Sequence, residues 1–66
     1  MNYRYYVQNH HTFVKKLMKL WDKNKGFPEW VHEYFKADIY YQYHSTVIDY
    51  VEFHEEKDYI WFLLQL

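Results

Sequence analysis

The sequence predicts a small α+β domain with an N-terminal strand, a helical hairpin and then two to three antiparallel strands. Two observations support this fold class. Apolar residues recur at helical spacing between residues 9 and 38, and apolar and polar residues alternate before and after that segment. Residues 1–66 are expected to form a single small domain, because so short a chain can support only one core.

The first expected element is a strand over residues 2–8. Tyr3, Tyr5 and Val7 fall on one side, and the residues between them fall on the other. A period of two among β-favouring residues is typical of a strand. We expect this strand to join those that follow the helices.

The clearest single pattern lies between Asn9 and Gly26 and predicts one amphipathic helix. Asn9 or Thr12 can cap its start with a side-chain oxygen, and Gly26 can take the left-handed conformation that ends a helix. Lysines occupy one flank. Six residues form the apolar face: Phe13, Val14, Leu17, Met18, Leu20 and Trp21.

A second helix is expected from Phe27 to about Asp38. Pro28 suits the first helical turn, and Glu29 suits the positive end of the helix dipole. The short link between the two helices predicts a hairpin. Four residues form the apolar side of the second helix: Trp30, Val31, Tyr34 and Phe35.

Alternation predicts strands at residues 39–43 and 47–53. Residues 59–66 are apolar on both sides and predict a third, covered strand, with the polar residues 55–58 as the turn before it. No Gly or Pro follows Pro28, although hairpin turns favour Gly. An all-α small bundle is therefore the alternative fold, because five residues here also fit a helical repeat: Ile39, Tyr43, Val47, Tyr50 and His54.

Asp49 is the one charged residue expected on a covered face. In a regular strand over residues 47–53 it would share that face with Val51 and Phe53. A carboxylate there needs a partner or gains a raised pKa. We expect instead that the strand is bulged or that its face is half open.

Residues that carry catalysis are scarce. The chain has no Cys, and its single Ser, Ser45, follows His44, but adjacent residues on a strand point to opposite faces and are badly placed for proton transfer. A single Gly cannot build a phosphate-binding loop. We expect no enzymatic activity, no cofactor and no metal site. The five histidines lack the one-turn spacing of a helical zinc pair: His10, His11, His32, His44 and His54.

The aromatic content indicates a binding function. Nine Tyr, five Phe and three Trp make up 26% of the chain, more than so small a core needs. Exposed aromatics usually mark a contact site. Charge is segregated as well: residues 1–28 carry six basic side chains against one acidic, and residues 29–66 carry two against eight.

The function expected from these features is that of a small protein-binding module, which binds and modulates or inhibits a host protein in the cytoplasm. Residues with AT-rich codons dominate the chain, which is typical of a phage or mobile-element accessory gene. Tyr and Trp dominate interface energetics, and carboxylates can imitate a phosphate backbone. The expected protein-binding residues are Tyr50, Glu52, His54, Glu55, Glu56, Asp58, Tyr59 and Trp61.

Two further interactions follow from the same residues. Nucleic-acid binding is the alternative function, through the basic helix at residues 12–25 and neighbouring tyrosines. A homodimer is expected through the apolar segment 59–64. No segment reaches the length that spans a membrane. The nucleic-acid-binding residues would be Arg4, Tyr6, Lys15, Lys16, Lys19 and Lys23.

Overall fold

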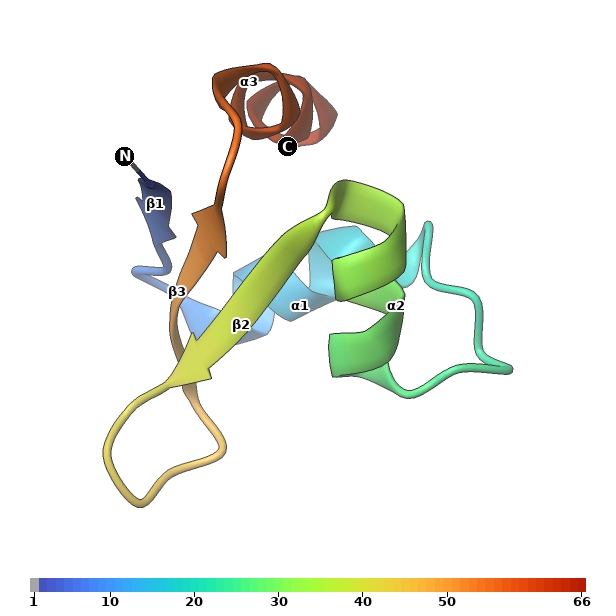
Figure 1. The fold of residues 1–66 in the computed structure, drawn as a ribbon. Coiled ribbons are helices and arrows are strands. Elements are labelled where there is room, and N and C mark those ends of the chain that lie inside the picture. The colour runs from blue at the N-terminus through green and yellow to red at the C-terminus, as the bar shows by residue number, and fades with distance from the viewer. Residues whose placement is uncertain (1) are drawn as a thin grey trace.

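The computed structural model describes residues 2–66 and contains three helices and a three-stranded antiparallel sheet (Figure 1). The predicted α+β class is confirmed, and the all-α alternative is wrong. In chain order the elements are β1 (Tyr3–Tyr6), α1 (His10–Met18), α2 (Phe27–Phe35), β2 (Ala37–Tyr41), β3 (Ile48–Phe53) and α3 (Glu56–Gln65).

The sheet has the order β1-β3-β2, so the N-terminal strand joins the two later strands, as predicted. β3 lies in the centre and pairs with both neighbours in antiparallel register. Phe53 lies opposite Tyr3 on one side and opposite Ala37 on the other. One end of the sheet is thereby aligned across all three strands.

The three helices contribute to one core on a single face of the sheet, centred on Phe62 of α3. The Phe62 side chain is fully buried, and its ring contacts aromatic rings of the sheet and of the other two helices. Ring centroids lie 4.9–6.0 Å apart, as in favourable aromatic pairs. The four rings around Phe62 come from β1, α1, α2 and β3: Tyr5, Phe13, Phe35 and Phe53.

The first helix begins as predicted but ends earlier. The Asn9 side chain accepts a hydrogen bond from the Thr12 backbone N–H at 3.0 Å, which is the expected cap. The helix ends at Met18 rather than near Gly26. Trp21 explains the early end, because its ring packs against Phe27 and its Nε1 donates to a backbone carbonyl of the following turn.

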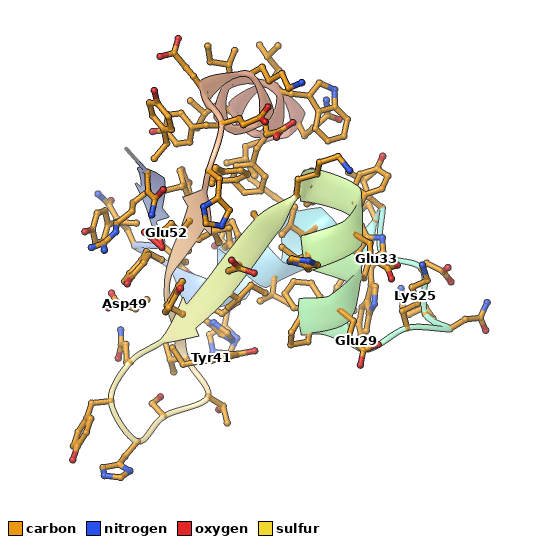
Figure 2. The ribbon with its side chains drawn as sticks, viewed as in Figure 1. Lys25, Glu29, Glu33, Tyr41, Asp49 and Glu52 are labelled. Atoms are coloured by element: carbon orange, nitrogen blue, oxygen red, sulfur yellow. The ribbon has the colours of Figure 1, made fainter. Side chains whose placement is uncertain are left out.

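The second helix begins where it was predicted but ends at Phe35 rather than near Asp38, which lies in β2. Pro28 lies in its first turn, and Glu29 lies near its positive end. Gly26 is the residue before this helix, with extended backbone, so the prediction that it adopts the left-handed conformation is wrong. Instead Lys36 takes that conformation where α2 gives way to β2. An ion pair between Lys25 and Glu33 ties the preceding loop to α2 (Figure 2).

The prediction of a third strand at residues 59–66 is wrong, because this segment forms α3. The acidic residues Glu56 and Asp58 do not form a turn but lie in the first turn of the helix, where the helix dipole favours negative charge. Tyr59, Phe62 and Leu66 face the core at helical spacing. The apolar residues on the opposite side of this helix are exposed. Segment 59–66 is therefore apolar on both sides although it is not a covered strand.

Asp49 lies at a bulge, as expected. Tyr40 pairs with Tyr50, whereas the next residue, Tyr41, pairs with Ile48, so Asp49 has no partner on β2. The extra residue lets Ile48 and Val51 both face the core although they are three positions apart. Asp49 is left half-exposed at the edge of that face.

We predict that Phe62→Ala lowers the free energy of unfolding by about 3–5 kcal/mol, because it removes the ring that joins the layers of the core. A domain of this length has a total stability of about 3–10 kcal/mol. Urea unfolding followed by circular dichroism measures the change. Leu64→Ala is the matched control on the same helix, because Leu64 is 77% exposed and the loss there should stay within about 0.5 kcal/mol. Equal effects at the two positions would contradict the central role of Phe62.

Candidate functional site

The sheet face opposite the helices carries a cluster of aromatic and charged side chains, here called the open face. Residues alternate along each strand, so those between the core residues project to this side. The pairing of β3 with β1 and β2 then places side chains of all three strands next to one another. The open face consists of Arg4 and Tyr6 from β1, Tyr50 and Glu52 from β3, and Asp38 and Tyr40 from β2.

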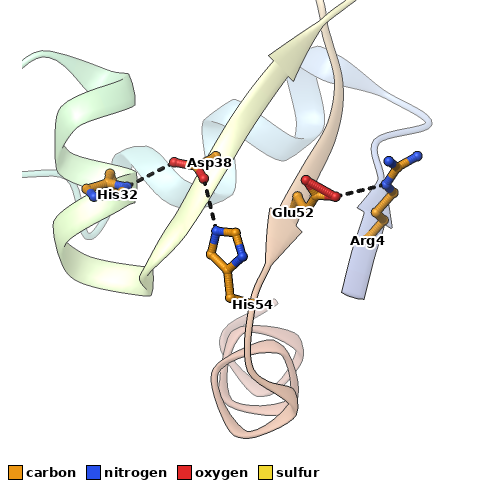
Figure 3. A network of polar contacts seen from close by, with 5 residues as sticks. All are labelled: Arg4, His32, Asp38, Glu52 and His54. Carbon is orange, nitrogen blue, oxygen red and sulfur yellow. Dashed lines mark hydrogen bonds and ion pairs between the residues drawn. The ribbon is translucent and has the colours of Figure 1, made fainter. Parts of the chain in front are cut away.

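Glu52 is the buried charge at the centre of the open face. Only 6% of its surface is exposed, and Arg4 Nε donates to its Oε1 at 3.1 Å (Figure 3). The Arg4 guanidinium also lies 4.6 Å from the centre of the Tyr50 ring, as in a cation–π contact. Contacts with the Tyr6 hydroxyl and the Glu52 carboxylate raise the pKa of Arg4 above its ordinary value. Arg4 therefore neutralises Glu52.

Three tyrosine rings pack side by side across the open face. Tyr40 and Tyr50 are stacked with centroids 4.8 Å apart, and Tyr6 lies 5.3 Å from Tyr50 on its other side. Arg4 Nη1 donates to the Tyr6 hydroxyl at 3.3 Å. The outer rings are well exposed, 56% for Tyr6 and 41% for Tyr40. This arrangement presents large apolar area that is already ordered before any partner arrives.

The Glu52 carboxylate also acts on Tyr40. Its negative charge is the largest cause of a pKa of Tyr40 raised above the usual value, and burial of the hydroxyl and the charge of Asp38 act in the same direction. Tyr40 therefore keeps its proton more tightly in the folded chain than in the unfolded chain.

The Asp38 carboxylate connects the open face to α2 and to the segment between β3 and α3. Its Oδ1 lies 3.0 Å from His32 Nδ1 of α2, and its Oδ2 lies 3.4 Å from His54 Nε2 after β3 (Figure 3). Beside these groups lies a surface depression of about 490 Å³, here called the acidic hollow. Three acidic residues and one Lys line it with the two histidines: His32, Glu33, Lys36, His54, Glu55 and Asp58.

The predicted protein-binding residues do not share one surface. Tyr50 and Glu52 lie on the open face. His54, Glu55 and Asp58 line the acidic hollow at the end of the open face. Glu56 is exposed in the first turn of α3. Tyr59 belongs mostly to the core, where it packs on Tyr3 and Phe53. Trp61 packs against Tyr34 and Phe35 of α2.

Trp61 belongs to a separate apolar patch on α3. Ile60, Leu63 and Leu64 are exposed beside it, one helical turn apart, and Tyr34 of α2 adjoins it. This α3 patch contains the part of segment 59–64 that the core does not use. The structure therefore divides the expected contact residues between two surfaces.

The residues of the nucleic-acid alternative are brought together only in part, because Tyr6 and Lys16 line the same hollow of about 370 Å³ at the end of β1. Arg4 and Tyr6 lie on the open face, whereas α1 packs against the other side of the sheet through Phe13 and Leu17. The exposed residues Lys15 of α1 and Lys19 at its C-cap do not line this hollow. Lys23 bends back, with its Nζ 3.3 Å from the Met18 carbonyl and 5.1 Å from the Trp21 ring centre.

Three residues of this region were missed from the sequence: Tyr40, Asp38 and His32. Tyr40 lies in the predicted strand 39–43, and the alternation there already assigned it to one side with Gln42. Its stacking on Tyr50 depends on the cross-strand register, which alternation alone does not give.

Within residues 2–66, no three His, Asp or Glu side chains come together in a way that would hold a metal ion. None of the helices in this part of the chain is long and apolar enough to cross a membrane.

We predict that the folded protein loses stability above about pH 10, and that Tyr40→Phe reduces this loss. The raised pKa of Tyr40 favours folding while the hydroxyl is protonated, and that contribution disappears as the pH rises through the raised value. Urea unfolding between about pH 8 and about pH 11 measures the difference. Tyr43→Phe is the control, because Tyr43 is 89% exposed. If both variants lose as much stability as the wild type, Glu52 does not act on Tyr40.

No protein-family model, curated protein or solved structure matches this chain.

Proposed function

We propose that this chain is a non-enzymatic protein-binding module, and that the open face is its contact surface. The observation that carries the proposal is the ordered group of Tyr6, Tyr40, Tyr50 and Arg4 over a buried carboxylate. Tyr and Arg are the residues most often responsible for binding energy at protein interfaces. Rings that are already packed lose little conformational entropy on binding.

Charge defines the chemistry of the partner. Arg4 is neutralised by Glu52, so the open face offers little free positive charge. The acidic hollow at its end holds Glu33, Glu55 and Asp58 against the single cation Lys36. A partner surface with apolar side chains opposite the tyrosines and Lys or Arg opposite the hollow would complement both parts.

The biological role that fits this surface is that of an accessory protein of a phage or mobile element, which binds a host protein in the cytoplasm and modulates or inhibits it. An amino-acid composition rich in residues whose codons are AT-rich supports this role. The α3 patch offers further apolar area for a partner large enough to reach it, and it is also a surface through which two copies of the chain could associate.

We predict that the immobilised chain recovers a stoichiometric protein from host extract, and that the double variant Tyr6→Thr with Tyr40→Thr recovers at least about tenfold less. Thr preserves strand propensity, so the sheet should remain intact while the aromatic contacts are lost. Recovery is measured by quantitative mass spectrometry after nuclease treatment, which removes proteins held only through nucleic acid.

The matched control for the capture is Lys15→Gln with Lys19→Gln, which changes two exposed residues on the helix side of the sheet. This variant should recover the same protein in the same amount. The proposal would be overturned if no stoichiometric protein is recovered, or if the tyrosine variant retains as much as the wild type.

We predict further that the chain shows no measurable affinity for single-stranded or duplex DNA or RNA, even at low salt. A nucleic-acid site needs several unpaired cations beside stacking rings, whereas Arg4 is held by Glu52 and, of the two lysines of α1, Lys16 alone lines a hollow with Tyr6. Fluorescence anisotropy with labelled oligonucleotides measures the affinity. Salt-dependent binding that is lost in the Lys15→Gln, Lys19→Gln variant would instead establish the nucleic-acid alternative.

A further inference from the structure

The outer edge of β1 is an unpaired sheet edge. β1 is an end strand of the sheet, and no other element of residues 2–66 lies beyond it (Figure 1). A hollow of about 370 Å³ lies beside this edge, between the end of β1, the start of α1 and Leu66. There is thus space for side chains of an added strand on the helix side of the sheet.

The register identifies which backbone groups face outward from β1. Val7 N–H donates to the Asp49 carbonyl at 2.9 Å, so Val7 faces β3. In an antiparallel pair the residues that face the partner strand alternate with those that face away. The N–H and C=O groups of Arg4 and Tyr6 therefore face away from β3, where they can accept a new strand.

The opposite edge of the sheet, along β2, is less suited to strand addition. A register shift lies at Tyr40 and Tyr41, near the end of β2, and such irregularities protect sheet edges. Asp38 adds a charged side chain to this strand. On β1 the only charged side chain is Arg4, and its charge is already neutralised within the chain by Glu52. Repulsion between two approaching edges is therefore smallest at β1.

We infer that two copies of this chain associate through antiparallel pairing of their β1 edges, in the register that sets Arg4 opposite the partner's Tyr6. The pairing is self-complementary: the outward groups of Arg4 and Tyr6 meet those of the partner's Tyr6 and Arg4 about a twofold axis. It places each guanidinium beside a tyrosine ring, a contact that Arg4 already makes with Tyr50. A register with Arg4 opposite the partner's Arg4 would instead bring like charges together.

This dimer would extend the sheet to six strands with both open faces on the same side. The twofold axis is perpendicular to the sheet, so the aromatic rings of the two copies form one continuous surface. Half-buried Tyr5 would meet the partner's Tyr5 across the axis on the helix side. The inference concerns self-association alone and does not depend on the protein partner proposed above.

Oligomeric state and backbone methylation together test the pairing. Light scattering after gel filtration should give twice the 8.5 kDa of one chain at high concentration. A synthetic chain methylated on the Tyr6 backbone nitrogen loses the outward N–H but keeps the side chain and every hydrogen bond to β3. Its dimer dissociation constant should rise at least about tenfold, because two bonds between the chains are lost.

The matched control carries the same methyl group on the backbone nitrogen of Ile39, which faces outward from β2. It should dimerise like the unmodified chain, and circular dichroism checks that both synthetic chains fold. Amide hydrogen exchange provides a second measurement on the unmodified protein: exchange at Arg4 and Tyr6 should slow as concentration rises. A chain that stays monomeric at high concentration, or a dimer unaffected by methylation at Tyr6, would overturn the inference.

Discussion

Contacts of the Phe62 ring with four other rings determine most of this architecture. Tyr5, Phe13, Phe35 and Phe53 reach it from four different elements, so one side chain joins the sheet to all three helices. A chain of 66 residues has no disulfide to compensate for a small core, and clustered aromatic area is its substitute. Because all three helices of residues 2–66 pack on this face of the sheet, none of them covers the other face.

The uncovered face explains why so many tyrosines lie outside the core. A tyrosine offers a flat apolar ring and a hydroxyl that can face water, so Tyr6 and Tyr40 can remain exposed without the cost of bare aliphatic surface. Between them Glu52 is removed from water, and Arg4 is its compensating charge. An ion pair of this kind contributes little net stability, but loss of either partner leaves an uncompensated charge. Its main effect is to hold the rings in one arrangement.

Local patterns predicted the elements whose burial is one-sided. The alternation of Tyr3, Tyr5 and Val7 identified β1, and Asn9 and Pro28 marked the starts of α1 and α2. The pattern failed at residues 59–66, where helix α3 buries one stripe and exposes another that is equally apolar. It also failed after Met18, because the packing of Trp21 on Phe27 is a tertiary contact that helical spacing cannot reveal. Tyr50 and Glu52 were predicted as contact residues. The positions of Tyr40 and Asp38 beside them depend on the pairing register of β2 with β3, which includes the bulge at Asp49.

Segregated charge in the sequence becomes a difference between surfaces in the fold. Exposed lysines of α1 lie on the helix side, and acidic residues of α2 and α3 gather at the end of the open face beside His54. Tyr40 therefore lies near the carboxylates of Glu52 and Asp38, whereas Tyr6 lines a hollow with Lys16. Stacking rings attract nucleic acid only when cations accompany them, and carboxylates repel phosphates. The carboxylates near Tyr40 therefore oppose the approach of a phosphate backbone to that part of the open face, and pairing of two β1 edges would double the aromatic area without changing these charges.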